Sequence, residues 1–133
     1  MEQYGIGQPV RRKEDIRFVT GQGNYTDDIN LDGQAYAAIL RSPFAHADFA
    51  ITDISAAQAL PGVIAVYTYA DTASELPEIP CQVNVKCATG QEMFVPPRYV
   101  LAKNRARFTG EPIAFVIAES RVQAHDALEA IEV

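Results

Sequence analysis

Hydrophobic and polar positions divide the chain into an unpatterned start and a patterned remainder. Residues 1–33 hold five glycines and one proline but little periodic apolar character, which predicts an extended arm with turns. From Gln34 onward, short apolar runs rich in β-branched and aromatic residues alternate with turn residues. The first three strands are expected at residues 34–42, 48–54 and 63–69. The first two are expected to pair as a hairpin around the break at Ser42-Pro43.

Two helices are expected, one short and one longer. Ser55 can cap a short helix in AAQAL, because its hydroxyl can accept a free amide of the first turn, and Pro61-Gly62 ends that helix. The longer helix begins near Ser120, and its apolar positions share one face: Ala124, Ala127, Leu128 and Ile131. It meets no Gly or Pro before the last residue, Val133, so the chain is expected to be a fragment of a longer polypeptide.

The last strands are expected in YVLAKNRARF and EPIAFVIA, joined near Thr109-Gly110. The second run is almost wholly apolar, which favours a central strand covered on both faces, with Pro112 at its start. Residues 71–98 carry four prolines and both cysteines without a sustained pattern, and they form a long excursion of the kind that usually has a function or a covering partner. Strand, short helix and strand in succession indicate an α+β domain, with a single domain over residues 1–133.

Composition narrows the function classes. The 133 residues are 48% hydrophobic and 21% charged, with a net charge of -6, which is typical of a globular domain and not of a nucleic-acid binder. The only basic cluster, Arg11-Arg12-Lys13, is followed at once by two acids and is interpreted as a solvated segment. No apolar run approaches the roughly 20 residues of a membrane span. The N-terminal residues lack the order of a secretory signal, so a cytoplasmic location is expected.

The stretch TGQGNYTDDI, residues 20–29, holds half of a dinucleotide-binding fingerprint, since Gly21 and Gly23 are followed by Thr26 where a third glycine is needed. Asp27-Asp28 lacks the alternating oxygen ligands and closing Glu of a calcium loop. The stretch is therefore interpreted as a turn in which aspartate side chains bond nearby amides and the ring of Tyr25 is buried.

The remaining chemical candidates are few. Cys81 and Cys87 are two thiols where a zinc or iron–sulfur site normally needs four ligands, and they are interpreted as reduced, with a disulfide as the alternative. Arg41 and His46 flank the break at Ser42-Pro43. They could form a small polar site, but the simpler interpretation is a corner in which Arg41 bonds carbonyls and His46 packs on a strand. Glu111 has no identifiable partner acid or base and is interpreted as a turn residue. One helix stripe is interpreted as a solvated face: Arg121, His125 and Glu129.

Three stretches taken together resemble the large, molybdenum-binding subunit of the molybdenum hydroxylases. They are GIGQPVRRKEDIRFVTGQGNYTDDI, RSPFAHADFAITDISAAQALPGVIAVYTYAD and YVLAKNRARFTGEPIAFVIAESRVQAHDALEAIEV. That family includes xanthine dehydrogenase, aldehyde oxidase and aerobic carbon monoxide dehydrogenase, and the stretches occur in the family's order. Only the Pro-rich part around residues 74–95 has no counterpart.

The resemblance implies the α/β hammerhead domain that opens this subunit, with a mixed sheet. It implies an enzyme that hydroxylates a small aldehyde or heterocycle, or oxidises carbon monoxide, with oxygen from water at a molybdenum–molybdopterin centre. Electrons would leave through [2Fe-2S] clusters to FAD in partner subunits or domains. The family's catalytic and cofactor-binding motifs lie in later domains, so no catalytic, cofactor-binding or metal-binding residue is assigned here, and the isolated chain is expected to be inactive.

Two functions remain open at this point. One is a structural domain that packs on the later molybdenum-binding domains and on the iron–sulfur and flavin subunits. The other is a free-standing interaction module of the same fold that binds a partner through the Pro-rich excursion or an exposed strand edge. In the first case, faces normally covered by other domains would be apolar and exposed, and the isolated domain could self-associate.

Overall fold

The computed structural model describes residues 7, 9, 11–83 and 85–133, and its contacts form two units, residues 1–32 and 33–133. The rest of the expected arm, at residues 1–6, 8 and 10, lies outside the described residues. In the first unit, helix α1 (Asp15–Val19) occupies part of the arm expected to be extended, and the 3-10 helix η1 (Thr26–Asp28) lies in the stretch expected to be a turn. The Oγ1 of Thr20 donates to the Ile16 carbonyl at 2.7 Å, and this side-chain bond closes the end of α1.

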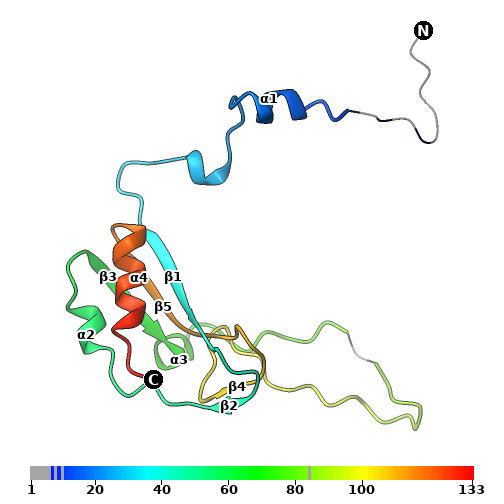
Figure 1. Ribbon diagram of the computed structural model, residues 1–133. Helices are drawn as coiled ribbons and strands as arrows, with labels where there is room; N and C mark the ends of the chain where they lie inside the picture. Colours follow the sequence, from blue (N-terminus) through cyan, green and yellow to red (C-terminus); the bar gives the residue numbers. More distant parts are fainter. Residues whose placement is uncertain (1–6, 8, 10, 84) are drawn as a thin grey trace. The chain divides into compact units, whose positions relative to one another are not determined.

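Three strands form the main sheet of the second unit (Figure 1). Their order is β1 (Tyr36–Arg41), β5 (Pro112–Ala118) and β3 (Val63–Thr68), and both pairings are antiparallel. The expected central position of the apolar strand and the place of Pro112 at its start are confirmed. The α+β class is also confirmed, although all strand pairs among the described residues are antiparallel where a mixed sheet was expected.

The expected hairpin between residues 34–42 and 48–54 is wrong. Most of the second segment is irregular, and its strand β2 (Ala47–Asp48) pairs with β4 (Arg105–Ala106) in a separate two-stranded sheet. β1 pairs instead with β5, whose apolar side chains continue the buried face of β1 across the ladder. Burial on a shared face outweighs closeness in sequence in this choice of partner.

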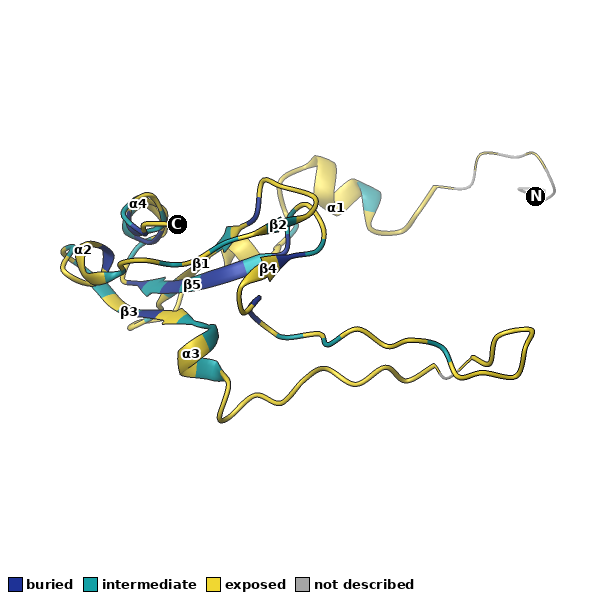
Figure 2. Cartoon of the chain, turned by 90° about the horizontal axis from the view of Figure 1, so that it is seen from below, coloured by how far each residue is buried: buried dark blue, intermediate teal, exposed yellow. Residues whose placement is uncertain are grey.

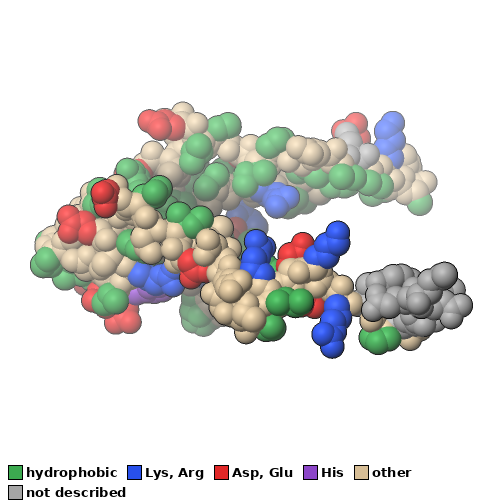
Figure 3. Space-filling view, turned by 90° about the horizontal axis from the view of Figure 1, so that it is seen from above, with side chains coloured by type: hydrophobic (Ala, Val, Ile, Leu, Met, Phe, Trp, Pro, Cys, Tyr) green, Lys and Arg blue, Asp and Glu red, His purple; other side chains and the backbone are tan. Residues whose placement is uncertain are grey.

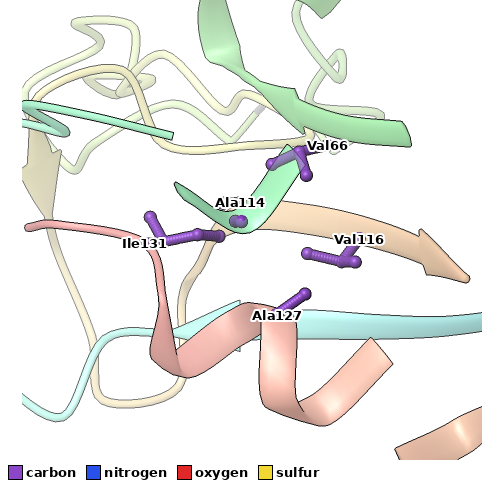
Figure 4. Packing of buried hydrophobic residues seen from close by; sticks show 6 residues of the cluster. Val66, Ala114, Val116, Ala127 and Ile131 are labelled. Carbon is purple, nitrogen blue, oxygen red and sulfur yellow. The ribbon is translucent and has the colours of Figure 1, made fainter. Parts of the chain in front are cut away.

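One face of the sheet carries the core. Helices α2 (Ser55–Gln58) and α4 (Arg121–Glu129) pack on this face, where alternate residues of β5 are fully buried (Figures 2 and 4). The helix face predicted by spacing is confirmed, since Ala124, Ala127 and Ile131 are buried and Leu128 packs against them. The main cluster contains Ala57, Val66, Ala114, Val116, Ala127 and Ile131. The opposite face of β5 is only partly covered. The sequence predicted cover on both faces, and this is confirmed only for the face that packs on the helices.

The two predicted helix starts differ in outcome. Helix α4 begins at Ser120 as expected, and Ser120 also caps it, because its Oγ accepts the amide of Gln123 at 3.3 Å. Ser55 is the first residue of α2 and not its cap. Both its amide and its hydroxyl donate to the carboxylate of Asp53, at 2.9 and 2.6 Å, so Asp53 supplies the acceptor at this helix start.

Replacing the cap of α4 should destabilise the domain modestly. Ser120→Ala removes the acceptor for the Gln123 amide and should lower the free energy of unfolding by about 1 kcal/mol. Urea denaturation followed by circular dichroism measures this change. Ser120→Asp is the matched control, since aspartate is an equally good cap and should restore stability; a loss as large as that of the alanine variant would contradict the capping role.

The Pro-rich excursion begins at the end of α3 (Tyr69–Thr72), and after it the chain returns to the sheet at Ala102, whose amide donates to the Pro112 carbonyl at 2.8 Å. Its two sides run together, joined by the Ile79 amide to the Arg98 carbonyl at 2.7 Å and by a bridge between Lys86 and Glu92. Hydrophobic side chains lie exposed along it (Figure 3): Leu76, Ile79, Val83, Val85, Phe94 and Val95. None of the helices in the described residues has the length and apolar character needed to cross a membrane.

Candidate functional site

The break after β1 forms a polar corner, made by Arg41, Ser42, Arg107, Gly110 and Glu111. The Ser42 amide donates to the Glu111 carbonyl at 2.9 Å, and the Gly110 amide donates to the Ser42 carbonyl at 2.8 Å. Arg41 donates from Nη1 to the Gly110 carbonyl at 2.9 Å, as the corner interpretation predicted. Ser42 is buried, and its Oγ is held by the backbone of Phe44, so it is a turn residue and not a poised nucleophile.

Glu111 supports the same corner with its side chain. It is only 8% exposed, its Oε2 accepts the backbone amide of Arg107, and its Oε1 lies 3.9 Å from Nη1 of that arginine. Both carboxylate oxygens therefore face Arg107, which confirms the interpretation as a turn residue and leaves neither oxygen directed at a substrate. Sequence reasoning missed these partners because they depend on a loop geometry that no motif encodes.

His46 does not pack on a strand, contrary to expectation; it is exposed beyond the polar corner. The ion pair nearby joins Asp48 of β2 to Arg105 of β4, with Arg105 Nε donating to Oδ1 and Nη2 donating to Oδ2 at 3.1 Å. The hydrogen bond and charge of Arg105 lower the pKa of Asp48 below its ordinary 3.8, and His46 adds to this effect. The pair fastens the short sheet at its exposed edge.

The stability supplied by the Asp48–Arg105 pair should disappear in acid. Because the folded-state pKa of Asp48 is lowered, its contribution is present above 3.8 and is lost as the pH falls through the lowered value. The melting temperature of wild type should therefore be higher than that of Asp48→Asn at neutral pH. The two melting temperatures should become equal well below pH 3.8. High salt should reduce the difference between them at neutral pH, because it screens the exposed pair. Asp126→Asn, on the exposed side of α4, is the control. A gap between wild type and Asp48→Asn that persists in acid would contradict this account.

A second candidate is a groove on the face of the sheet opposite α2 and α4, with a volume of about 520 Å³. Its floor is formed by Ile39, Tyr67 and Phe115, which lie in register on β1, β3 and β5. Leu76 and Val100 form its walls, and Asp71 and Glu75 stand at its rim. This sheet groove is apolar with an acidic edge, which suits the binding of an apolar group more than catalysis.

The stretch of residues 20–29 is a turn, as predicted. The carboxylate of Asp28 accepts the Tyr25 amide at 2.8 Å. Tyr25 is 60% exposed, so its ring is not buried as expected; it stacks on Phe18 at 5.3 Å between centroids. A Cβ on Gly23 would come within 2.3 Å of the Phe18 ring, and this contact explains the glycine without any phosphate ligand.

The remaining candidates do not converge on a metal or catalytic centre. Cys81 and Cys87 are free and exposed. The helix stripe of Arg121, His125 and Glu129 is exposed, as predicted. In the described part of the chain, no group of three or more His, Cys, Asp or Glu side chains could hold a metal ion. The absence of assigned catalytic and metal-binding residues stays a prediction, since it was an interpretation of sequence alone.

The start of helix α3 was not predicted, although the sequence contains a signal for it. Asp71 accepts both the amide and the hydroxyl of Thr68, at 2.7 and 2.9 Å, and so fixes the start of α3 at the edge of the sheet groove. The residues Thr68-Tyr69-Ala70-Asp71 follow the spacing of a capping box, which could have revealed this helix. The aromatic contact between Tyr69 and Tyr99, at 4.9 Å, had no such signal.

Comparisons with known proteins converge on one group. The model of a family described as "Aldehyde oxidase and xanthine dehydrogenase, a/b hammerhead domain" matches residues 20–133. The chain is 44% identical to nicotine 6-hydroxylase large subunit of Paenarthrobacter nicotinovorans, over 95% of its own length and 15% of the relative's. It is 39% identical to carbon monoxide dehydrogenase large chain of Afipia carboxidovorans, over 97% of its length and 15% of the relative's.

A solved structure, quinoline 2-oxidoreductase from Pseudomonas putida 86, resembles the fold with a TM-score of 0.73 at 43% identity. The match covers 96% of this chain and 16% of the solved one. This chain thus spans about 15% of the length of the relatives it matches.

Proposed function

The chain belongs to the aldehyde oxidase and xanthine dehydrogenase hammerhead family, and on that premise we propose that it is a structural domain in the large subunit of a molybdenum-dependent oxidoreductase. The full enzyme would hydroxylate a small aldehyde or heterocycle, or oxidise carbon monoxide, with oxygen derived from water. A cytoplasmic location is part of the proposal.

One observation carries this proposal: nearly the whole chain aligns with a minor part of long oxidoreductase chains. The matches to nicotine 6-hydroxylase and carbon monoxide dehydrogenase cover 95% and 97% of this chain but only 15% of each relative. The match favours a domain of a large subunit over a free-standing interaction module, because the relatives carry this segment within much longer chains. The resemblance inferred from the sequence is confirmed at the level of family and fold.

The described residues do not fit a resident metal centre. The two cysteines are exposed, and no acid, histidine or cysteine cluster in the described range could hold a metal. We therefore propose that other domains of the subunit hold molybdopterin and molybdenum. In the proposal, [2Fe-2S] clusters and FAD belong to partner subunits or domains. What this chain supplies is packing: a sheet closed on one face by α2 and α4 and open on the other.

The proposal is tested on the native protein. Antibodies raised against this chain identify the natural polypeptide on a denaturing gel, and the purified protein is assayed for molybdenum and iron. We expect a band far larger than 14.5 kDa and both metals in the native complex. A band near 14.5 kDa without metals would contradict the proposal and turn attention to a free-standing module.

A further inference from the structure

The sheet groove lies on the side of the sheet opposite the core, whose own side is packed against α2 and α4. On the floor, Ile39 is 37% exposed and Tyr67 39%, and they flank Phe115 of the central strand. The rings of Tyr67 and Phe115 stack at 6.5 Å between centroids, which joins the apolar floor across β3 and β5. A central strand this apolar is typically covered on both faces.

The walls of the groove are apolar and uncovered as well. Leu76 is 47% exposed and Val100 42% exposed, although both lie where the excursion leaves and rejoins the sheet. α3 reaches this face beside β3, held there by the Thr68–Asp71 bonds, but it covers only one edge (Figure 2). The groove therefore has a fixed wall on one side and room of about 520 Å³ beside it. A mostly apolar groove of this volume is typical of a site that binds an apolar group.

The charges at the groove select its occupant. The residues lining it include two acids, Asp71 and Glu75, and no lysine or arginine. Asp71 already accepts the two Thr68 bonds, whereas Glu75 is an exposed carboxylate among the lining residues, so we take Glu75 as the partner for an incoming cation. A second copy of this chain is a poor occupant, since it brings a net charge of -6 and a further acidic rim. Ten residues line the groove, fewer than the roughly 20–30 residues a side of a standard specific interface.

We propose that, in the full-length subunit, the sheet groove is filled by an apolar segment of the same polypeptide, from outside these 133 residues, that places a lysine or arginine against Glu75. This inference rests on the proposed function. A second argument is the length of the relatives. The segment that matches this chain is only about 15% of each relative, so most of the polypeptide lies outside it. A covalently linked segment needs far less interface than a separate partner, because its local concentration is already high.

The test uses the native full-length subunit in its complex. A photo-crosslinking phenylalanine analogue replaces Tyr67 on the groove floor and, in a control, Val122, which is 70% exposed on α4 outside the groove. After irradiation, peptides joined to position 67 are identified by mass spectrometry. We expect a cross-link to a peptide of the same chain beyond these residues. Glu75→Lys should reduce its yield several-fold, whereas Glu119→Lys, exposed and outside the groove, should not.

Each other result overturns the inference. A cross-link to a second copy or to a different subunit would assign the groove to another occupant, and the absence of any cross-link from position 67 would leave the face open to solvent. Molybdenum content and intact mass are measured on the same preparation. A long, molybdenum-containing subunit without the cross-link refutes only the occupant, whereas a 14.5 kDa protein without metal refutes the proposed function together with it.

Discussion

Val116→Asp should abolish folding of the domain. Val116 lies at the middle of β5, is 0% exposed, and packs among Val66, Ala114 and Ala127 in the core. An aspartate there would place an unpaired charge in the main cluster, which costs about 3–5 kcal/mol or more. That is comparable with the whole stability of a small domain, about 5–15 kcal/mol. Far-ultraviolet circular dichroism and a urea titration should show a chain that is largely unfolded without denaturant.

The control for this substitution is the same change on the surface. Val122→Asp alters a residue of α4 that is 70% exposed, and we expect its free energy of unfolding to stay within about 0.5 kcal/mol of wild type. If both aspartate variants remain folded with similar midpoints, then β5 is not the centre of the core, and the strand order described above is wrong.

Glu111→Ala should produce the second largest loss. The substitution leaves the part-buried backbone amide of Arg107 without its carboxylate acceptor in the polar corner, and an unsatisfied donor costs up to about 1–3 kcal/mol. We expect the urea midpoint to fall accordingly while the m-value stays unchanged, because the fold itself persists. Amide hydrogen exchange at residues 105–111 should accelerate more than exchange in α4.

Two variants separate the hydrogen bond from the charge of Glu111. Glu111→Gln keeps an oxygen that can accept the Arg107 amide and should retain much of the stability. Glu129→Ala removes an exposed carboxylate from α4 and should have little effect. A glutamine variant as unstable as the alanine variant would show that the charge near Arg107, and not the hydrogen bond to its amide, stabilises the corner.

Local patterns in the sequence were sufficient for the elements that depend on local chemistry. The α4 helix was predicted with its start near Ser120 and its buried face, because helical spacing is a property of neighbouring residues. The β5 strand was predicted with its central position, since only a strand between two others needs so little polar surface. The turn at residues 20–29 was predicted because its glycines and aspartates have strong local preferences.

Pairing between distant segments was not predictable in the same way. The hairpin expected around Ser42-Pro43 was wrong because β1 lies beside β5, about seventy residues later in the chain. The polar corner depends on the same long-range contact, so Glu111 was classed as a turn residue without its partners. The sheet groove was also invisible to pattern analysis, because its floor combines single residues from three strands that only the register brings together.

The strand order β1-β5-β3 has a consequence for biosynthesis. β5 is the last of the described strands, yet both strand pairings of the main sheet are made with it. While the ribosome is still making residues 33–111, β1 and β3 have no partner, and their apolar side chains stay exposed near the exit tunnel. The sheet can close only when Ala118 has emerged, in a step dominated by contacts far apart in sequence, which makes folding slow. Nascent chains arrested before Pro112 should therefore be the species that need chaperones most.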